Sequence, residues 1–176
     1  RTMTIAHVFA EMEALSAAGV VENYALGGAV AAIRYLEPSA TQDVDIFVAF
    51  RSNVSSPLTP LAPVYEWLVN RGATPEGAHL IIGGWPVQFL PASGPLLEEA
   101  MSDAQVADVD GQSVRIFTAE HLAAIALQTG RTKDKLRVAQ FVEWSGFDRP
   151  RFTAIVERHG LLAKWRQLQR VLADAA

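Results

Sequence analysis

One segment of this chain restricts its fold more than any other: the apolar and acidic stretch that ends at Phe50. The stretch reads YALGGAVAAIRYLEPSATQDVDIFVAF. An apolar run ends in a pair of glycines, an alanine-rich segment follows, and a second apolar run begins with Asp43 and Asp45. This order predicts a strand, a glycine turn, a helix, a loop and a second strand that carries two carboxylates.

The two aspartates predict a site for a metal ion. Residues two apart on a strand point to the same face, so Asp43 and Asp45 are expected to project side by side. Two ionised carboxylates at that separation repel each other, which raises one pKa or requires a cation. Mg²⁺ is the usual cation, because it binds one or two carboxylates and takes its other ligands from water and phosphate. The other face of the strand carries apolar residues and is expected to be buried: Val44, Ile46 and Val48.

The glycine pair predicts a phosphate-binding turn. Gly27 and Gly28 permit unusual backbone angles and a close approach of the backbone to a ligand. The helix expected over Ala29–Leu36 would present unpaired N–H groups and the positive end of its dipole. A glycine pair alone is often only a turn, and two aspartates at a strand start are often only solvated. Their occurrence together, in this order, favours a functional site.

Two further residues of this stretch have two interpretations each. Arg34 lies on the expected helix, where it either reaches a phosphate or the carboxylates, or is a surface arginine that the helix dipole favours. Thr41 lies in the loop before the second strand, where it either hydrogen-bonds the loop or a substrate phosphate, or only caps the turn. The sequence leaves these alternatives open.

This arrangement resembles the signature of the nucleotidyltransferase superfamily typified by DNA polymerase beta. The resemblance is carried by the apolar-Gly-Gly element, a helix of suitable length, and the motif Thr41-x-Asp43-Val44-Asp45 before an apolar strand. Within the superfamily, the chain is most similar to small bacterial proteins of the AbiEii and MenT toxin type. The similarity covers Tyr24 to about Leu90, and continues more loosely through the later helices.

The resemblance implies an enzyme that transfers a nucleoside monophosphate from an NTP to an acceptor hydroxyl. It implies two Mg²⁺ ions, with Mn²⁺ as an alternative metal, bound by Asp43 and Asp45. It also implies that Gly27 and Gly28 cradle the phosphates and that Arg34 neutralises their charge. The acceptor is not specified by the resemblance, because members of the superfamily modify small molecules, proteins or tRNA.

A basic segment later in the chain extends the resemblance. Residues 131–137 read RTKDKLR, with four basic residues, and open an expected helix. By resemblance, Lys133 has a catalytic role in contact with the triphosphate, and Asp134 orients a basic residue or assists at the metal. The alternative is a solvated helix start in which Thr132 is the N-cap and the helix dipole favours Asp134.

One position departs from the superfamily pattern. The superfamily places a third carboxylate on the strand beside the two aspartates, and the matching residue here is Gln88. A glutamine offers a neutral carbonyl ligand, but it is neither a negative charge nor a general base. Together with Ala29, where many members carry serine or threonine, Gln88 supports a second hypothesis. In it, the chain is a catalytically degenerate binding or regulatory module, such as one component of a toxin–antitoxin type pair.

The remaining pattern predicts an α/β (α+β) fold, with a small mixed sheet, flanking helices and a C-terminal helical part. The first strand is expected at 20–26, helices at 4–18, 61–71, 95–101 and throughout the chain after Thr118, and hairpins at Gly83-Gly84 and Asp110-Gly111. We therefore expect a nucleotidyltransferase-like core at 1–117 and a helical part at 118–176, packed together as one globule.

Composition narrows the location and the partners. The net charge of −4 argues against a general basic surface for nucleic acid, although arginines near the C-terminus keep an RNA acceptor open. The sequence has no cysteine and no apolar run of the roughly 20 residues that cross a bilayer. Its first residues do not resemble a secretory signal. We therefore expect a cytoplasmic protein that binds an NTP, does not associate with a membrane, and forms a homodimer or binds a cognate partner protein.

Overall fold

The structure is a computed structural model that describes residues 5–36, 43–51 and 60–176. Thr41, with the rest of the loop expected at 37–42, lies outside the described residues. The helices are α1 (Ile5–Ala17), α2 (Gly28–Ala32), α3 (Ala62–Asn70), α4 (Pro95–Asp103), α5 (Ala119–Thr129), α6 (Thr132–Glu143), α7 (Arg149–Arg158) and α8 (Leu162–Asp174). The strands are β1 (Asn23–Gly27), β2 (Val44–Ala49), β3 (Thr74–Glu76), β4 (His79–Ile82), β5 (Trp85–Pro91), β6 (Gln105–Val109) and β7 (Gln112–Ile116).

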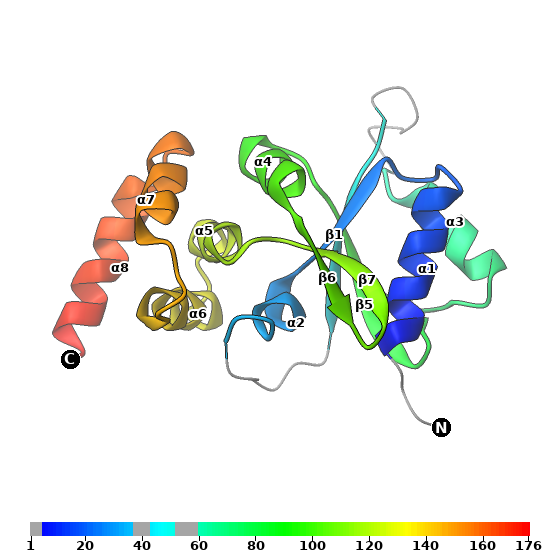
Figure 1. Cartoon of the computed structure of the whole chain (residues 1–176), viewed down its shortest axis with the longest axis horizontal. Coiled ribbons are helices and arrows are strands. Elements are labelled where there is room, and N and C mark those ends of the chain that lie inside the picture. Colours follow the sequence, from blue (N-terminus) through cyan, green and yellow to red (C-terminus); the bar gives the residue numbers. More distant parts are fainter. Residues whose placement is uncertain (1–4, 37–42, 52–59) are drawn as a thin grey trace.

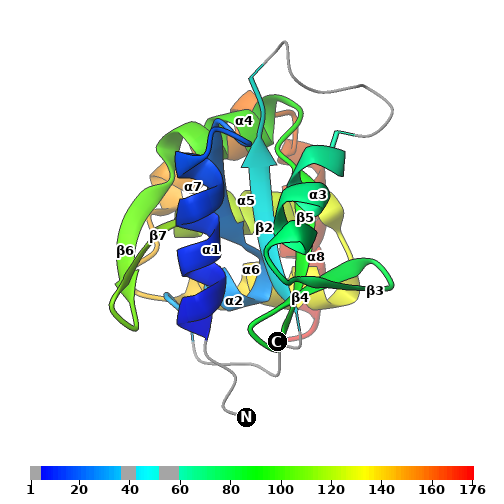
Figure 2. The same ribbon diagram turned by 90° about the vertical axis from the view of Figure 1, so that its right-hand side faces the viewer.

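The strands form one mixed sheet in the order β3-β4-β5-β2-β1-β7-β6. Two neighbouring pairs are parallel, β2 with β5 and β1 with β7, and the other four are antiparallel. The sheet lies between two groups of helices (Figure 1). Helices α1 and α3 cover one face, and α2, α4 and α5 lie on the other, with α7 and α8 farthest from the sheet. Figure 2 shows α1 and α3 in front of the strands. The fold is therefore the expected α/β class.

The central strand β2 separates the two faces of the sheet as its sequence predicts. Val44, Ile46 and Val48 are fully buried, which confirms the expected apolar face. Because side chains alternate along a strand, Asp45 and Phe47 point to the opposite face. That face is the one on which the later helices lie. None of the helices in the described part of the chain has the length and apolarity needed to cross a membrane.

The structure corrects three local expectations. The helix expected over Ala29–Leu36 is α2, which ends at Ala32 and continues only as turns to Leu36. The first strand begins at Asn23 rather than at residue 20, because the backbone N–H of Gly19 and Val20 still bond to the end of α1. The N-cap of α6 is Arg131 and not Thr132. Strand β3 was not expected at all, since a three-residue strand that contains proline has no alternating apolar pattern.

Both expected hairpins are confirmed. Strands β4 and β5 pair as neighbours across the glycine turn, with Ile82 opposite Trp85. At the second hairpin, Asp110 adopts a φ of 51°, which the short side chains of aspartate and asparagine tolerate better than most. Asp108 accepts a hydrogen bond from the backbone N–H of Gly111 at 3.1 Å, so this aspartate pair stabilises the turn.

A polar cluster around the buried His121 joins α4, α5 and α7. His121 is fully buried; its Nε2 lies 2.8 Å from Glu99 Oε2 and its Nδ1 lies 2.9 Å from Thr118 Oγ1. Since a carboxylate only accepts, Nε2 donates to Glu99 and the hydroxyl of Thr118 donates to Nδ1. Arg158 donates to the other oxygen of Glu99 at 2.7 Å. His159 Nε2 is 3.2 Å from Glu99 but is not aligned for a hydrogen bond.

We expect Glu99→Gln to destabilise the protein by about 1–2 kcal/mol at pH 7, because one hydrogen bond to a buried histidine and one exposed ion pair lose their charge. Hydrogen bonds from Arg158 and His121 lower the pKa of Glu99 from 4.5 to about 2, and the nearby ring of His159 acts in the same direction. A lowered pKa stabilises the fold above pH 4.5 and loses that effect as the pH falls toward 2. The difference in unfolding free energy between the variant and the wild type should therefore decrease below pH 4.5, as measured by urea titration.

The matched control for this change is Glu98→Gln, one residue earlier on the exposed side of α4. Its unfolding free energy should stay within about 0.5 kcal/mol of the wild type at every pH. A Glu99→Gln variant that is as stable as Glu98→Gln at pH 7 would contradict the stabilising role of the cluster.

Candidate active site

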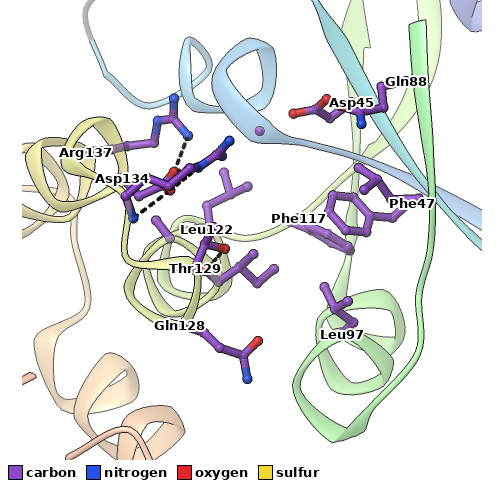
Figure 3. A pocket seen from close by; sticks show the side chains of 15 residues that line it. Asp45, Phe47, Gln88, Leu97, Phe117, Leu122, Gln128, Thr129, Asp134 and Arg137 are labelled. Carbon is purple, nitrogen blue, oxygen red and sulfur yellow. Dashed lines mark hydrogen bonds and ion pairs between the residues drawn. The ribbon is translucent and has the colours of Figure 1, made fainter. Parts of the chain in front are cut away.

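A cavity of about 330 Å³ lies between the sheet and helices α5 and α6. Figure 3 shows one rim formed by Asp45 and Gln88 on the strands and the opposite rim formed by Asp134 and Arg137 on α6. Between these rims the cavity is lined mainly by apolar side chains. The lining comprises Gly28, Asp45, Phe47, Gln88, Leu90, Leu97, Phe117, Leu122, Ile125, Ala126, Gln128, Thr129, Arg131, Asp134 and Arg137.

The two aspartates of the D-x-D motif have different surroundings. Asp45 lies within β2 and lines the cavity, whereas Asp43 precedes the strand, is about half exposed, and lies 3.4 Å from Nε2 of His79. Burial raises the pKa of Asp45 above its ordinary value, and the charge of Asp43 raises it further. The charges of Arg137, Lys133 and Arg131 act in the opposite direction. An apo protein therefore holds an electrostatically unfavourable carboxylate that a cation would stabilise.

The glycine pair has two separate steric roles. Gly27 ends β1, and a Cβ at this position would lie 2.5 Å from the ring of Phe47, so its role is packing. Gly28 has a φ of 62°, and a Cβ there would lie 2.1 Å from Oδ2 of Asp45. Only Gly28 lines the cavity. The absence of a side chain at Gly28 is what lets the Asp45 carboxylate lie against the turn and the start of α2.

We expect Gly28→Ala to destabilise the protein more than Gly77→Ala, although both glycines have nearly the same positive φ, 62° and 59°. Gly77 has no atom within 4 Å of the added Cβ, so its variant loses only about 1–2 kcal/mol to backbone strain. At Gly28 the methyl group must also displace the carboxylate of Asp45, which adds about 1–3 kcal/mol. Urea unfolding measures both losses, and equal losses would contradict the close approach of Asp45.

A cluster of charged residues at the start of α6 forms the opposite rim. Asp134 is 2% exposed, and its carboxylate accepts from Nε of Arg131 at 2.7 Å and from the backbone N–H of Arg131 at 3.2 Å. Nη1 of Arg137 lies 3.8 Å from the other oxygen of Asp134. One buried carboxylate thus orients two guanidinium groups toward the cavity. The three side chains together carry a net charge of about +1.

Two of the expected phosphate-binding residues lie elsewhere. Lys133 is exposed on α6, and Arg34 is exposed after the end of α2; neither lines the cavity. Arg131 and Arg137 line it instead, and neither is among the phosphate-binding residues expected from the sequence. The signal that would have found them is the spacing of Arg131, Asp134 and Arg137, three residues apart, which places them on one face of a helix. Lys133 falls outside that spacing.

Gln88 lies beside Asp45, as the strand register requires. Strands β2 and β5 are parallel, with Asp45 opposite Gln88 and Phe47 opposite Leu90. All four side chains line the cavity, so this face of the two strands forms its floor. Next to Asp45, the amide of Gln88 offers hydrogen-bond donors and a carbonyl oxygen but no negative charge.

The middle of the cavity is aromatic and aliphatic. Phe47 and Phe117 have ring centroids 5.1 Å apart at an interplanar angle of 46°, and Leu97 and Leu122 lie nearby (Figure 3). Phe117 is held at the end of β7, where its carbonyl oxygen accepts a hydrogen bond from Tyr35 Oη at 3.0 Å. The cavity therefore suits a ligand with one charged part and one planar apolar part.

The donor set limits how a metal ion could be held. Among the described residues, no three His, Cys, Asp or Glu side chains come together as a metal-binding group. Asp43 and Asp45 are two carboxylates of the kind that Mg²⁺ prefers, and Mg²⁺ commonly keeps water and phosphate oxygens as its other ligands. These residues fit a magnesium ion that shares its coordination with a bound phosphate group, and they do not fit a closed, all-protein site.

Comparisons with known proteins support the fold. No family model and no curated protein matches the sequence. Among solved structures, an antigenic nucleotidyltransferase-like protein from Paracoccidioides brasiliensis superposes with a TM-score of 0.56 at 13% identity, over 78% of this chain and 72% of that one. Two structures of the antibiotic-resistance factor ANT(2'')-Ia, one in complex with adenylyl-2''-tobramycin, match at 14% identity with TM-scores of 0.46. They cover 99% and 97% of this chain, and 94% and 98% of theirs. The superposition on the Paracoccidioides protein shows that the chain has a nucleotidyltransferase-like fold.

Proposed function

We propose that this protein is a nucleotidyltransferase that binds an NTP together with Mg²⁺ and transfers its nucleoside monophosphate to an acceptor hydroxyl. The observation that carries the proposal is the cavity with the carboxylate of Asp45 at one rim and the paired arginines at the other. A magnesium triphosphate needs both, since the metal needs acidic oxygens and the phosphates need cations. The nucleotidyltransferase-like fold is consistent with the same chemistry.

Each rim has a defined task in this proposal. Asp45 and Asp43 hold Mg²⁺, which neutralises the phosphate charge that develops during the transfer. Arg137 and Arg131 donate hydrogen bonds to phosphate oxygens from positions that Asp134 sets. Lys133 acts only through its charge, because its side chain does not line the cavity.

The middle of the cavity takes the nucleobase. A base is a planar ring, and rings stack favourably on aromatic side chains such as Phe117 and Phe47. A volume of about 330 Å³ lies within the range of small-ligand pockets, roughly 300–1,000 Å³. Gly28 lines the cavity, and its missing side chain lets the carboxylate of Asp45 lie against the turn at the phosphate end of the site.

One observation favours a rival function, a binding module without turnover. Gln88 is neutral and lies in register with Asp45, so β5 adds no carboxylate beside that of Asp45. Such a module would bind the magnesium NTP through the same residues and would not release pyrophosphate. The two functions therefore predict the same NTP binding and differ only in whether the nucleotide is turned over.

The test begins with calorimetric titration of the wild-type protein with ATP, GTP, CTP and UTP, with Mg²⁺ and with EDTA. We expect micromolar to millimolar binding of at least one NTP that weakens at least tenfold without Mg²⁺. Incubation with the same NTP labelled at its α-phosphate should then transfer label to a component of a cell extract. Absence of any NTP binding would contradict the proposed function, and binding without transfer or pyrophosphate release would favour the rival module.

A further inference from the structure

The end of the cavity that lies away from the charged rims carries a side-chain amide. Figure 3 shows Gln128 and Leu97 at this end, remote from Asp45 and Gln88. The side chain of Gln128 is exposed and makes no hydrogen bond to any other residue that the structure describes. With the phosphates at the rims and the base in the aromatic middle, this amide lies where the outer edge of the base is expected.

The backbone of Gln128 is fixed, although its amide is not. Nζ of Lys164 on α8 donates to the backbone carbonyl oxygen of Gln128 at 2.7 Å. The hydroxyl of the next residue, Thr129, donates to the carbonyl oxygen of Ile125 at 2.9 Å, and Gly130 ends α5 with a φ of 74°. A ligand therefore has to order only the side chain of Gln128, which limits the entropy cost of a hydrogen bond to it.

The part of the cavity between the rims offers few polar atoms. Away from the rims, Gln128 and Thr129 are the polar side chains among the described residues that line it. The hydroxyl proton of Thr129 is already donated to Ile125, whereas the amide of Gln128 offers both an acceptor oxygen and a donor nitrogen. This end therefore fits a base edge with one donor beside one acceptor. Any further polar group on the base would be buried without a partner against Leu97 and Leu122, which is unfavourable.

We propose that Gln128 selects adenine, so that the NTP of the proposed function, on which this inference rests, is ATP. Adenine presents its N6 amino group beside the N7 acceptor, and a glutamine amide pairs with both. Guanine presents two acceptors at the same edge, O6 and N7, and these are best paired by arginine or lysine. The arginines that line the cavity belong to the opposite rim. Guanine also has a second amino group for which this end has no acceptor.

The aromatic pair favours a purine over a pyrimidine. Phe47 and Phe117 stack on a planar base, and stacking increases with the area of the base that covers the rings. A pyrimidine has one ring instead of two, so it covers less of this surface. Its outer edge also lies closer to the sugar, and therefore farther from Gln128. Cytosine and uracil lose both the stacking area and the contact with the amide.

The first test is calorimetric titration with ATP, GTP, CTP and UTP in the presence of Mg²⁺. We expect the wild type to bind ATP at least about tenfold more tightly than each of the other three. Gln128→Ala should weaken ATP binding by about tenfold and GTP binding by less than about threefold. The matched control is Gln140→Ala, an exposed glutamine on α6 that does not line the cavity, and it should bind all four NTPs like the wild type.

A change in the ligand tests the same contact from the other side. Purine riboside triphosphate is ATP without the N6 amino group. The wild type should bind it about tenfold more weakly than ATP, whereas Gln128→Ala should bind the two ligands equally well. Inorganic triphosphate has no base and should bind equally to the wild type and to Gln128→Ala, which excludes damage to the charged rims.

Three results would overturn the inference. One is a wild-type protein that binds GTP as tightly as ATP, and another is one that does not distinguish ATP from purine riboside triphosphate. The third is a Gln128→Ala variant that loses affinity for all four NTPs and for inorganic triphosphate to the same extent. In each case magnesium NTP still binds, so the proposed function survives. A wild type that binds no NTP at all would instead remove both proposals together.

Discussion

Asp45→Asn is expected to stabilise the protein in EDTA while it abolishes Mg²⁺-dependent NTP binding. Burial and the charge of Asp43 raise the pKa of Asp45, so the ionised side chain destabilises the fold when no cation is bound. Asparagine removes the charge and keeps the shape. We expect a gain of about 0.5–2 kcal/mol, which corresponds to roughly 2–6 °C in melting temperature for a chain of this size. The affinity for magnesium NTP should fall at least about 100-fold, since one of two metal carboxylates is lost.

The sign of the pH dependence follows from the direction of the shift. A carboxyl whose pKa is raised by folding destabilises the folded state above its ordinary pKa of 3.8, where the unfolded chain is ionised. The advantage of Asp45→Asn should therefore be present at pH 7–8 and vanish as the pH falls below that value. Thermal unfolding of both proteins in EDTA at several pH values measures this difference in stability. The control Asp174→Asn, at the exposed end of α8, should change neither stability nor NTP binding. An Asp45→Asn protein that still binds magnesium NTP like the wild type would contradict the assignment.

The local features of the site follow from the sequence because they depend on neighbours in the chain. Alternation along residues 44–48 identified the buried and the polar face of β2, and the glycine pair located the turn before α2. The hairpin at Gly83 put Gln88 on the strand beside Asp45, in agreement with the register of β5. Each of these inferences needs only a period of two or a turn, which a single sequence displays directly.

The features that the sequence did not predict are those that join distant segments. Phe117 meets Phe47 across the cavity although they are far apart in the chain, and Arg137 reaches the cavity because α6 packs beside α5. His79 approaches Asp43 only because β5 lies between β4 and β2. Such contacts depend on the strand order and on how the C-terminal helices pack. The sequence predicted only a phosphate-binding role for Gly28. The structure adds a steric one, because the carboxylate of Asp45 leaves no room for a Cβ at this position. The boundary predicted at residue 117 stays a prediction.

The basic residue of α6 that matters most for NTP affinity is expected to be Arg137 and not Lys133. Arg137 lines the cavity, is only 17% exposed, and is oriented by Asp134. Its guanidinium can donate two hydrogen bonds to a phosphate. We expect Arg137→Ala to weaken NTP binding by about 10- to 100-fold, or about 1.4–2.8 kcal/mol, in calorimetry with Mg²⁺. Lys133→Ala should weaken it less than about threefold, because an exposed charge that does not touch the ligand is screened by salt.

The two variants are matched controls for each other, since each removes one positive charge from the same helix. A difference in their NTP affinities distinguishes a direct contact with the phosphates from the general electrostatic attraction of residues 131–137. Raising the salt concentration to about 0.5 M should erase the small effect of Lys133→Ala, while much of the loss in Arg137→Ala remains. If Lys133→Ala instead weakened NTP binding more than Arg137→Ala, the ion pairs among Arg131, Asp134 and Arg137 would only stabilise the start of the helix. The triphosphate would then have to lie outside the cavity, on the exposed side of α6, and the assignment of the rim opposite Asp45 would be wrong.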